Sequence, residues 1–146
     1  MKSQGEIEAA VCDGVSRFQQ EFIGRGPRDI HAHLVGTLLM VRLQGVLTPA
    51  ERQLLAPRHE PAAETAGGAN GNGNGNQQGN GRALLKQVRA HMVATGRERL
   101  TEMVEAATGV GVVSVHHDIS TVTGEEVLVF SLDKPPACRP KATKKS

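Results

Sequence analysis

The feature that most constrains this chain is a tract of fifteen residues, 67–81, that cannot contribute to a hydrophobic core. It contains seven Gly, five Asn and two Gln. Ordering so many glycines costs more backbone entropy than these side chains could recover by burial. With the Pro-containing stretch before it, the tract predicts a flexible linker over about 57–81. The 146-residue chain must therefore build its fold from one segment on each side.

The glycines of this tract do not form a nucleotide-binding motif. A phosphate loop needs Lys-Ser or Lys-Thr after its glycines, and a dinucleotide fingerprint needs a strand before them. Neither condition is met, because a short helical pattern and a Pro-containing stretch precede the tract. We therefore expect no nucleotide, and no other residue pattern indicates a cofactor.

Two long helices are indicated, one on each side of the linker. Residues 4–23 place apolar side chains at steps of three and four, which is typical of one buried helical face, and Gly24 follows them. A second helix is expected over about 82–107, with Gly109 as its C-cap. Gly96 in its middle costs about 1 kcal/mol relative to Ala, so it indicates a slight bend or close packing.

Each long helix is followed by a pair of strands. We predict strands at Arg28–Leu34 and Thr37–Leu43, and again at Val110–Ile119 and Glu125–Leu132. The second strand is apolar almost throughout, which is typical of a central strand covered over much of both faces. A short helix is expected from Thr48, its N-cap.

These elements define the fold class. Two hairpins and two long helices predict a two-layer α+β domain over residues 1–133, with a four-stranded antiparallel sheet. The order helix, hairpin, helix, hairpin also fits two αββ units. One unit alone exposes a helix stripe and a sheet face, so two chains could exchange halves or pair edge strands. A homo-oligomer, in the form of a dimer, is therefore expected.

Charge is distributed unevenly along the chain. Residues 134–146 carry five basic and no acidic side chains, whereas residues 1–133 carry 12 basic and 15 acidic ones. We expect the last segment to be a disordered basic tail that aids solubility or touches anionic surfaces weakly. The body is mildly acidic and the chain has no Trp or Tyr, which argues against specific nucleic-acid binding.

Neither secretion nor membrane insertion is predicted. The N-terminus lacks an apolar signal region, and the longest apolar stretch, near Leu34–Val41, falls far short of the roughly 20 residues that a membrane helix needs. Two cysteines, Cys12 and Cys138, make no disulfide framework. We expect a cytoplasmic protein that reaches a membrane only through a partner.

Two pairs of side chains are candidate ligands. His31 and His33 point to one face of the first strand, and His116 and Asp118 share a face of the third. If the hairpins adjoin, these four could converge into a ligand set that zinc accepts. Solvated histidines on a sheet face are the alternative, and no HExxH or CxxC accompanies them. A metal- or small-ligand-binding sensor is therefore an alternative function.

Nucleophilic catalysis finds little support. Ser114 and Ser120 lie near His116 and Asp118, but all four fall within a few residues and no GxSxG motif is present. Short polar side chains here, Thr121 included, serve more simply to satisfy the backbone of a turn. We therefore expect a protein that is not an enzyme.

Three arginines flank the first hairpin: Arg25, Arg28 and Arg42. Guanidinium groups in this arrangement could bind an anionic group. Solvated salt bridges are the alternative.

Four stretches of the sequence form a recognisable set. They are G-R-G-P at Gly24–Pro27, V-R-L-Q-G-V-L-T-P-A-E at Val41–Glu51, L-L-K-Q-V-R at Leu84–Arg89, and V-V-S-V-H-H-D-I-S-T-V-T-G-E-E-V-L-V-F-S-L-D at Val112–Asp133. Together they resemble a small bacterial family described as component C of a sodium-translocating, membrane-potential-generating system (MpsC-like). The similarity covers nearly all of residues 5–56 and 82–133, and the last stretch is its most specific part.

The resemblance implies an association with a membrane cation or inorganic-carbon transport system. With no membrane span and no catalytic set predicted, we expect a non-enzymatic accessory protein that binds a protein partner. The resemblance supplies no catalytic residues. The Gly/Asn tract stands where the family has a short connection, and His31, His33 and His117 depart from the family pattern. The residues that match the motif, and that it suggests for recognition, are His116, Asp118, Thr121 and Gly124.

Overall fold

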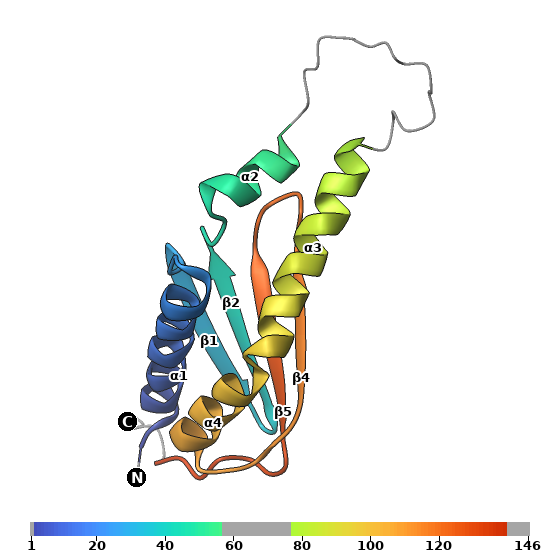
Figure 1. Cartoon of the computed structure of the whole chain (residues 1–146). Coiled ribbons are helices and arrows are strands. Elements are labelled where there is room, and N and C mark those ends of the chain that lie inside the picture. Colours follow the sequence, from blue (N-terminus) through green and yellow to red (C-terminus); the bar gives the residue numbers. More distant parts are fainter. Residues whose placement is uncertain (1, 57–76, 140–146) are drawn as a thin grey trace, which may run out of the picture.

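The computed structural model describes residues 2–56 and 77–139. Within them, four antiparallel strands form one sheet in the order β1-β2-β5-β4, and helices cover one of its faces (Figure 1). The strands are β1 (Asp29–Val35), β2 (Leu38–Gln44), β4 (Val112–Ile119) and β5 (Glu126–Leu132). The helices are α1 (Gln4–Phe18), the π-helical turn η1 (Gln19–Ile23), α2 (Pro49–Leu55), α3 (Gln77–Thr95) and α4 (Arg97–Thr108). The predicted two-layer α+β fold is confirmed.

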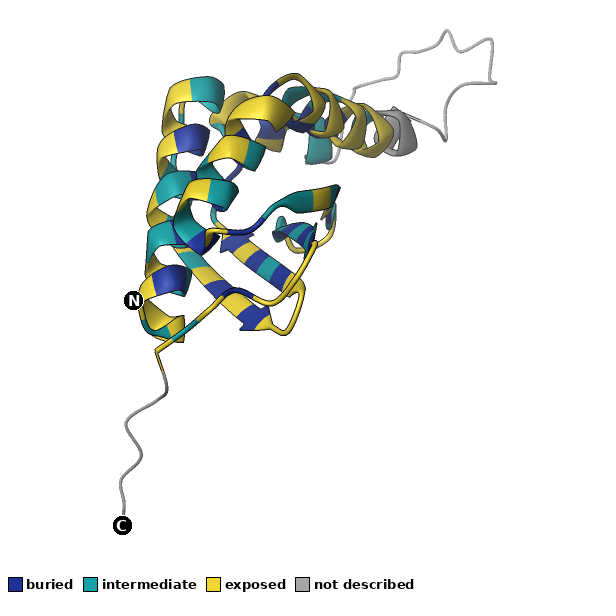
Figure 2. Cartoon of the chain, turned by 90° about the horizontal axis from the view of Figure 1, so that it is seen from below, coloured by how far each residue is buried: buried dark blue, intermediate teal, exposed yellow. Residues whose placement is uncertain are grey.

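The two hairpins join through their second strands. β2 and β5 pair antiparallel, with Met40 opposite Val129, so they are the central strands of the sheet. α1 precedes the first hairpin, and α3 with α4 precede the second, which repeats the αββ order. The prediction that β2 is central is confirmed. Its expected cover on both faces is not found, because the helices lie on one side of the sheet (Figure 2).

Helix α1 begins at a capping box and ends in a change of helical register. The Ser3 side chain accepts from the Glu6 backbone N–H, and the Glu6 carboxylate accepts from the Ser3 N–H. The hydrogen bond to Ser3 holds the pKa of Glu6 below its ordinary value. After Phe18 the chain makes the π turn, and Gly24 closes it at φ 100°. This turn leaves Gln19 fully buried over the sheet.

The predicted second long helix is two helices, α3 and α4, that meet at Gly96. A Cβ atom at Gly96 would collide with the Phe18 ring. That ring stacks on Phe22 with centroids 4.8 Å apart. Close packing against α1 is therefore the reason for this glycine, and the helix changes direction there.

Two predicted boundaries are wrong. α3 begins at Gln77, so residues 77–81 of the expected linker are helical, while 57–76 lie outside the described residues. Residues 134–139 of the expected disordered tail are described, and Arg139 lies beside the N-terminal segment, where its N–H donates to the Lys2 carbonyl at 2.8 Å. Residues 140–146 lie outside the described residues. In the part of the chain that is described, no helix has the length and apolarity needed to cross a membrane.

Candidate functional site: the two faces of the sheet

The sequence-predicted ligand residues lie on one face of the sheet but at opposite edges. His31 and His33 are on β1, whereas His116 and Asp118 are on β4. β2 and β5 lie between these edges, and three strand spacings of about 4.8 Å separate them by about 14 Å. The four side chains therefore do not converge. No group of three or more ligand-type side chains in residues 2–56 and 77–139 could hold a metal ion.

The β4 pair is engaged locally. His116 Nε2 lies 3.1 Å from the Ser114 hydroxyl. Asp118 instead pairs with Lys86 of α3 at 3.1 Å and accepts from the Ile119 N–H at 2.8 Å. The hydrogen bond from Lys86 is the main cause that lowers the pKa of Asp118. Asp118 therefore does not orient the His116 ring, and Ser114, His116 and Asp118 do not form a catalytic triad.

The β4–β5 turn uses its short polar side chains to satisfy its own backbone. The Ser120 hydroxyl accepts from the N–H groups of Val122 and Thr123. Gly124 adopts φ 81°, which favours glycine. The turn interpretation is confirmed for Asp118 and Ser120, and the geometry gives Gly124 a backbone role. Recognition by His116, Asp118, Thr121 and Gly124 stays a prediction.

The face that the helices leave uncovered carries a run of aliphatic side chains on its central strands and at the end of β1. Met40 and Val129 face each other across β2 and β5 and are only partly buried. At one end of the run, Val35 and Leu38 keep 68% and 41% of their surface exposed. We call this set the apolar stripe; it comprises Val35, Leu38, Met40, Val127 and Val129.

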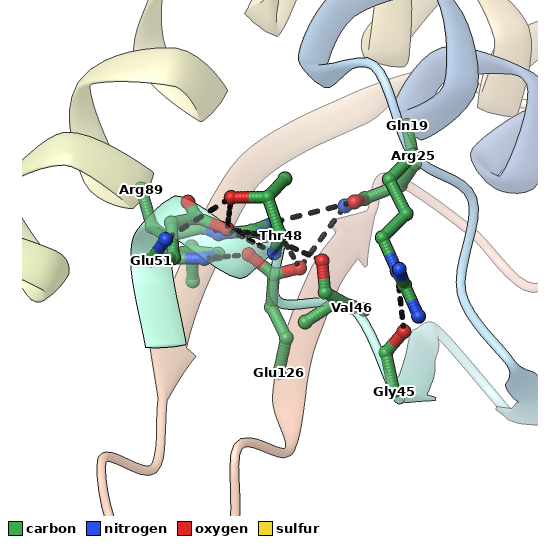
Figure 3. A network of polar contacts seen from close by, with 9 residues as sticks. Gln19, Arg25, Gly45, Val46, Thr48, Glu51, Arg89 and Glu126 are labelled. Atoms are coloured by element: carbon green, nitrogen blue, oxygen red, sulfur yellow. Dashed lines mark hydrogen bonds and ion pairs between the residues drawn. The ribbon is translucent and has the colours of Figure 1, made fainter. Parts of the chain in front are cut away.

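The covered face holds a cluster of polar side chains that the sequence analysis missed. Arg89 of α3 lies at its centre, fully buried, and donates from Nε and Nη2 to the Glu51 carboxylate at 3.0 and 2.7 Å (Figure 3). Its Nη1 lies 3.2 Å from Oε1 of Glu126, which is also fully buried. We call this set the buried polar cluster; it comprises Gln19, Glu51, Arg89, His117 and Glu126.

Hydrogen bonds within this cluster saturate the guanidinium group. Arg89 Nη2 also donates to the Val46 carbonyl at 2.8 Å, and Nη1 to the Gln19 side chain at 3.3 Å. Glu126 further accepts from Gln19 Nε2 at 3.0 Å and lies 2.7 Å from His117 Nε2. Such pairing is what makes a buried charge tolerable, because an unpaired one costs several kcal/mol. The cluster ties η1, α2, α3, β4 and β5 together.

Three members of the cluster occupy positions that the local pattern assigns to the core. Arg89 follows Leu85 by four residues on α3, and Gln19 follows Val15 by four. Glu126 alternates in phase with Leu128 on β5. The sequence signal that could have predicted the cluster is a polar residue on an otherwise apolar face, because such residues are rarely buried without a partner.

Of the two free cysteines, Cys12 is a poor candidate nucleophile. Burial, and then the nearby carboxylates of Asp13 and Glu8, raise the pKa of the Cys12 thiol. The thiolate is the reactive form, so a raised pKa suppresses it.

The architecture is that of a small α+β domain made from two helix–hairpin units, with a closed polar interior and one uncovered sheet face. The family model for the Na+-translocating membrane potential-generating system (MpsC) matches residues 3–66 and 76–134. The chain belongs to this family. The unmatched residues 67–75 fall within the Gly/Asn tract.

A relative with a curated record is similar over nearly its whole length. The uncharacterized protein YbcI of Bacillus subtilis (strain 168) is 29% identical over 131 residues, which cover 90% of this chain and 89% of the relative. No solved structure shows a significant match to the chain.

Proposed function

We propose that the protein is a non-catalytic accessory component of a membrane cation or inorganic-carbon transport system. It works in the cytoplasm and binds a protein partner through the uncovered sheet face. The family's description supports an association with a membrane-potential system. The uncovered face supplies the surface for the contact.

The observation that carries this proposal is the apolar stripe. Strands with apolar residues on both faces are typical of sheets that are covered on both sides. In β2, Leu39 and Val41 are fully buried beneath the helices, while Leu38 and Met40 point to the uncovered face. The second layer that this pattern calls for is absent from the described part of the chain, and a partner supplies it.

Charges around the stripe indicate the chemistry of the partner. His31, His33, His116 and Arg42 surround it on the same face. Arg42 is paired with Glu125 at 2.6 Å and His31 with Asp29 at 3.4 Å, whereas the rings of His33 and His116 can donate hydrogen bonds to a carboxylate of the partner. We therefore propose a partner segment with aliphatic side chains flanked by Asp or Glu.

The size of the face sets the class of contact. Four strands about 4.8 Å apart and six residues of about 3.3 Å each give a face of about 300–400 Å². A standard interface buries about 800 Å² on each partner. The contact is therefore transient, or it extends over the rim.

Site-specific photo-crosslinking in cells tests the proposal. A benzophenone amino acid is placed at Leu38 on the stripe and, as a control, at Gln87, which is exposed on α3. Products are identified by mass spectrometry. We expect the Leu38 position, and not Gln87, to crosslink to a cytoplasmic acidic segment of a membrane cation or inorganic-carbon transporter.

Other products would contradict the assignment of the partner. Crosslinks from Leu38 to a second copy alone would identify the face as a dimer interface. Equal labelling from Leu38 and Gln87, or a soluble protein as the sole product at Leu38, would also overturn it.

A further inference from the structure

A cavity of about 220 Å³ opens at the end of the sheet where α2 and the β4–β5 turn meet. Its walls come from segments far apart in the sequence, because the β2–α2 connection at Gly45–Leu47 lies beside Thr123 and Gly124. Two arginines, Arg28 and Arg52, line it. Neither belongs to the buried polar cluster or the apolar stripe.

The arginines at this cavity are not neutralised by ion pairs. In residues 2–56 and 77–139, neither Arg28 nor Arg52 makes a salt bridge or a side-chain hydrogen bond. A third, Arg25, contributes only its Nε, which donates to the Gly45 carbonyl at 3.4 Å (Figure 3). Arg42, by contrast, is paired with Glu125. Three guanidinium groups thus gather at one end of the sheet with donors unused.

The charge behind the cavity wall does not cancel them. Val46 separates the cavity from the buried polar cluster, since its carbonyl accepts from Arg89. That cluster holds two carboxylates against one guanidinium, so the three arginines outnumber its single excess carboxylate.

The backbone fixes the position of one arginine. The Arg28 N–H donates to the Gln44 carbonyl at 2.8 Å. Gly45 has φ 68°, and a Cβ atom there would collide with the Cβ of Arg28. Glycine therefore lets the two segments touch. The base of the Arg28 side chain is held by packing, while its guanidinium group is left at the cavity.

We propose that this cavity is a binding site for a small oxyanion, a phosphate or carboxylate group. Guanidinium forks match the paired oxygens of both groups. A volume of about 220 Å³ lies below the 300–1,000 Å³ typical of sites for drug-sized ligands, so a single anionic group fits and a whole nucleotide does not.

The test is a titration of the full-length protein, followed through the amide NMR signals of Gly45 and Gly124. Inorganic phosphate and acetate are the two probes, each against sodium chloride at equal ionic strength. Variants Arg28→Gln and Arg52→Gln remove the proposed ligands one at a time. Arg97→Gln is the matched control, because Arg97 is exposed on α4 and its replacement changes the net charge by the same amount.

We expect saturable shifts with at least one probe, and the better probe tells a tetrahedral from a planar ligand. Arg28→Gln and Arg52→Gln should each weaken binding about tenfold, which is the loss of one charge-assisted hydrogen bond, and Arg97→Gln should change it less than about twofold. Shifts no larger than those with chloride, or equal weakening by Arg97→Gln, would overturn the site. This result is independent of any protein partner.

Discussion

Each face of the sheet holds side chains that are unusual for its surroundings: the covered face buries charged groups within the apolar core, and the uncovered face exposes aliphatic ones. The covered face buries Arg89 and Glu126 completely, whereas the uncovered face leaves Val35 and Leu38 in contact with solvent. The buried charges are saturated by one another, so they hold five elements in one arrangement. The exposed aliphatic side chains of the uncovered face have no comparable contacts within the described part of the chain. The comparison assigns fold specificity to one face and recognition to the other.

The largest effect is expected from removing the centre of the buried polar cluster. Arg89→Leu leaves the buried Glu51 and Glu126 carboxylates without their guanidinium partner. We predict a fall of about 3–5 kcal/mol in the free energy of unfolding, measured by urea denaturation. Arg97→Leu is the control and should stay within about 0.5 kcal/mol. A loss below about 1 kcal/mol for Arg89→Leu would mean that the cluster is not structural.

Adjacent residues of β2 compare the two faces directly. Leu39 is fully buried and Met40, one residue further, points to the uncovered face. Leu39→Ala should cost about 2–5 kcal/mol through lost burial and the cavity left behind. Met40→Ala should cost about 1 kcal/mol or less, because the side chain is only partly buried in the isolated protein. Equal losses in urea denaturation would show that the uncovered face is packed in the isolated protein.

The smallest effect is expected at the edge of the uncovered face. Because Lys86 lowers the pKa of Asp118, the native state favours the carboxylate more than the unfolded chain does. The pair therefore contributes stability above the ordinary carboxyl pKa of about 3.9, and loses it as pH falls through the lowered native value. Lys86→Gln should flatten the acid limb of a stability–pH profile. An unchanged limb would show that the exposed pair contributes nothing.

The sequence predicts the elements well because periodicity is a local property. The buried face of α1, with Val11, Val15 and Phe18, and the capping box at Thr48 can each be recognised within a few residues of sequence. The sequence left two explanations for Gly96, a slight bend or close packing. Only the contact with Phe18, which is distant in sequence, shows that close packing requires the glycine. The start of α3 at Gln77 was missed because composition alone favoured a linker there.

The candidate sites depend on non-local contacts, which explains what was missed. Whether His33 and His116 meet depends on the strand order, and that order places two strands between them. Arg89 and Glu126 lie 37 residues apart in the sequence. The only sign of their pairing within each element is a polar residue at a position where the pattern predicts an apolar one. Arg28 was identified as an anion ligand candidate, but its companion Arg52 comes from another element.

One variant tests the central claim most directly. Met40→Glu places a carboxylate in the apolar stripe at a position that is only partly buried on the uncovered face, so the fold should tolerate the change. The free energy of unfolding and photo-crosslinking from Leu38 are measured on the same protein. We predict a free energy within about 0.5 kcal/mol of the parent and loss of the partner crosslink. An undiminished crosslink, or a stability loss above about 2 kcal/mol, would contradict the assignment of this face to recognition.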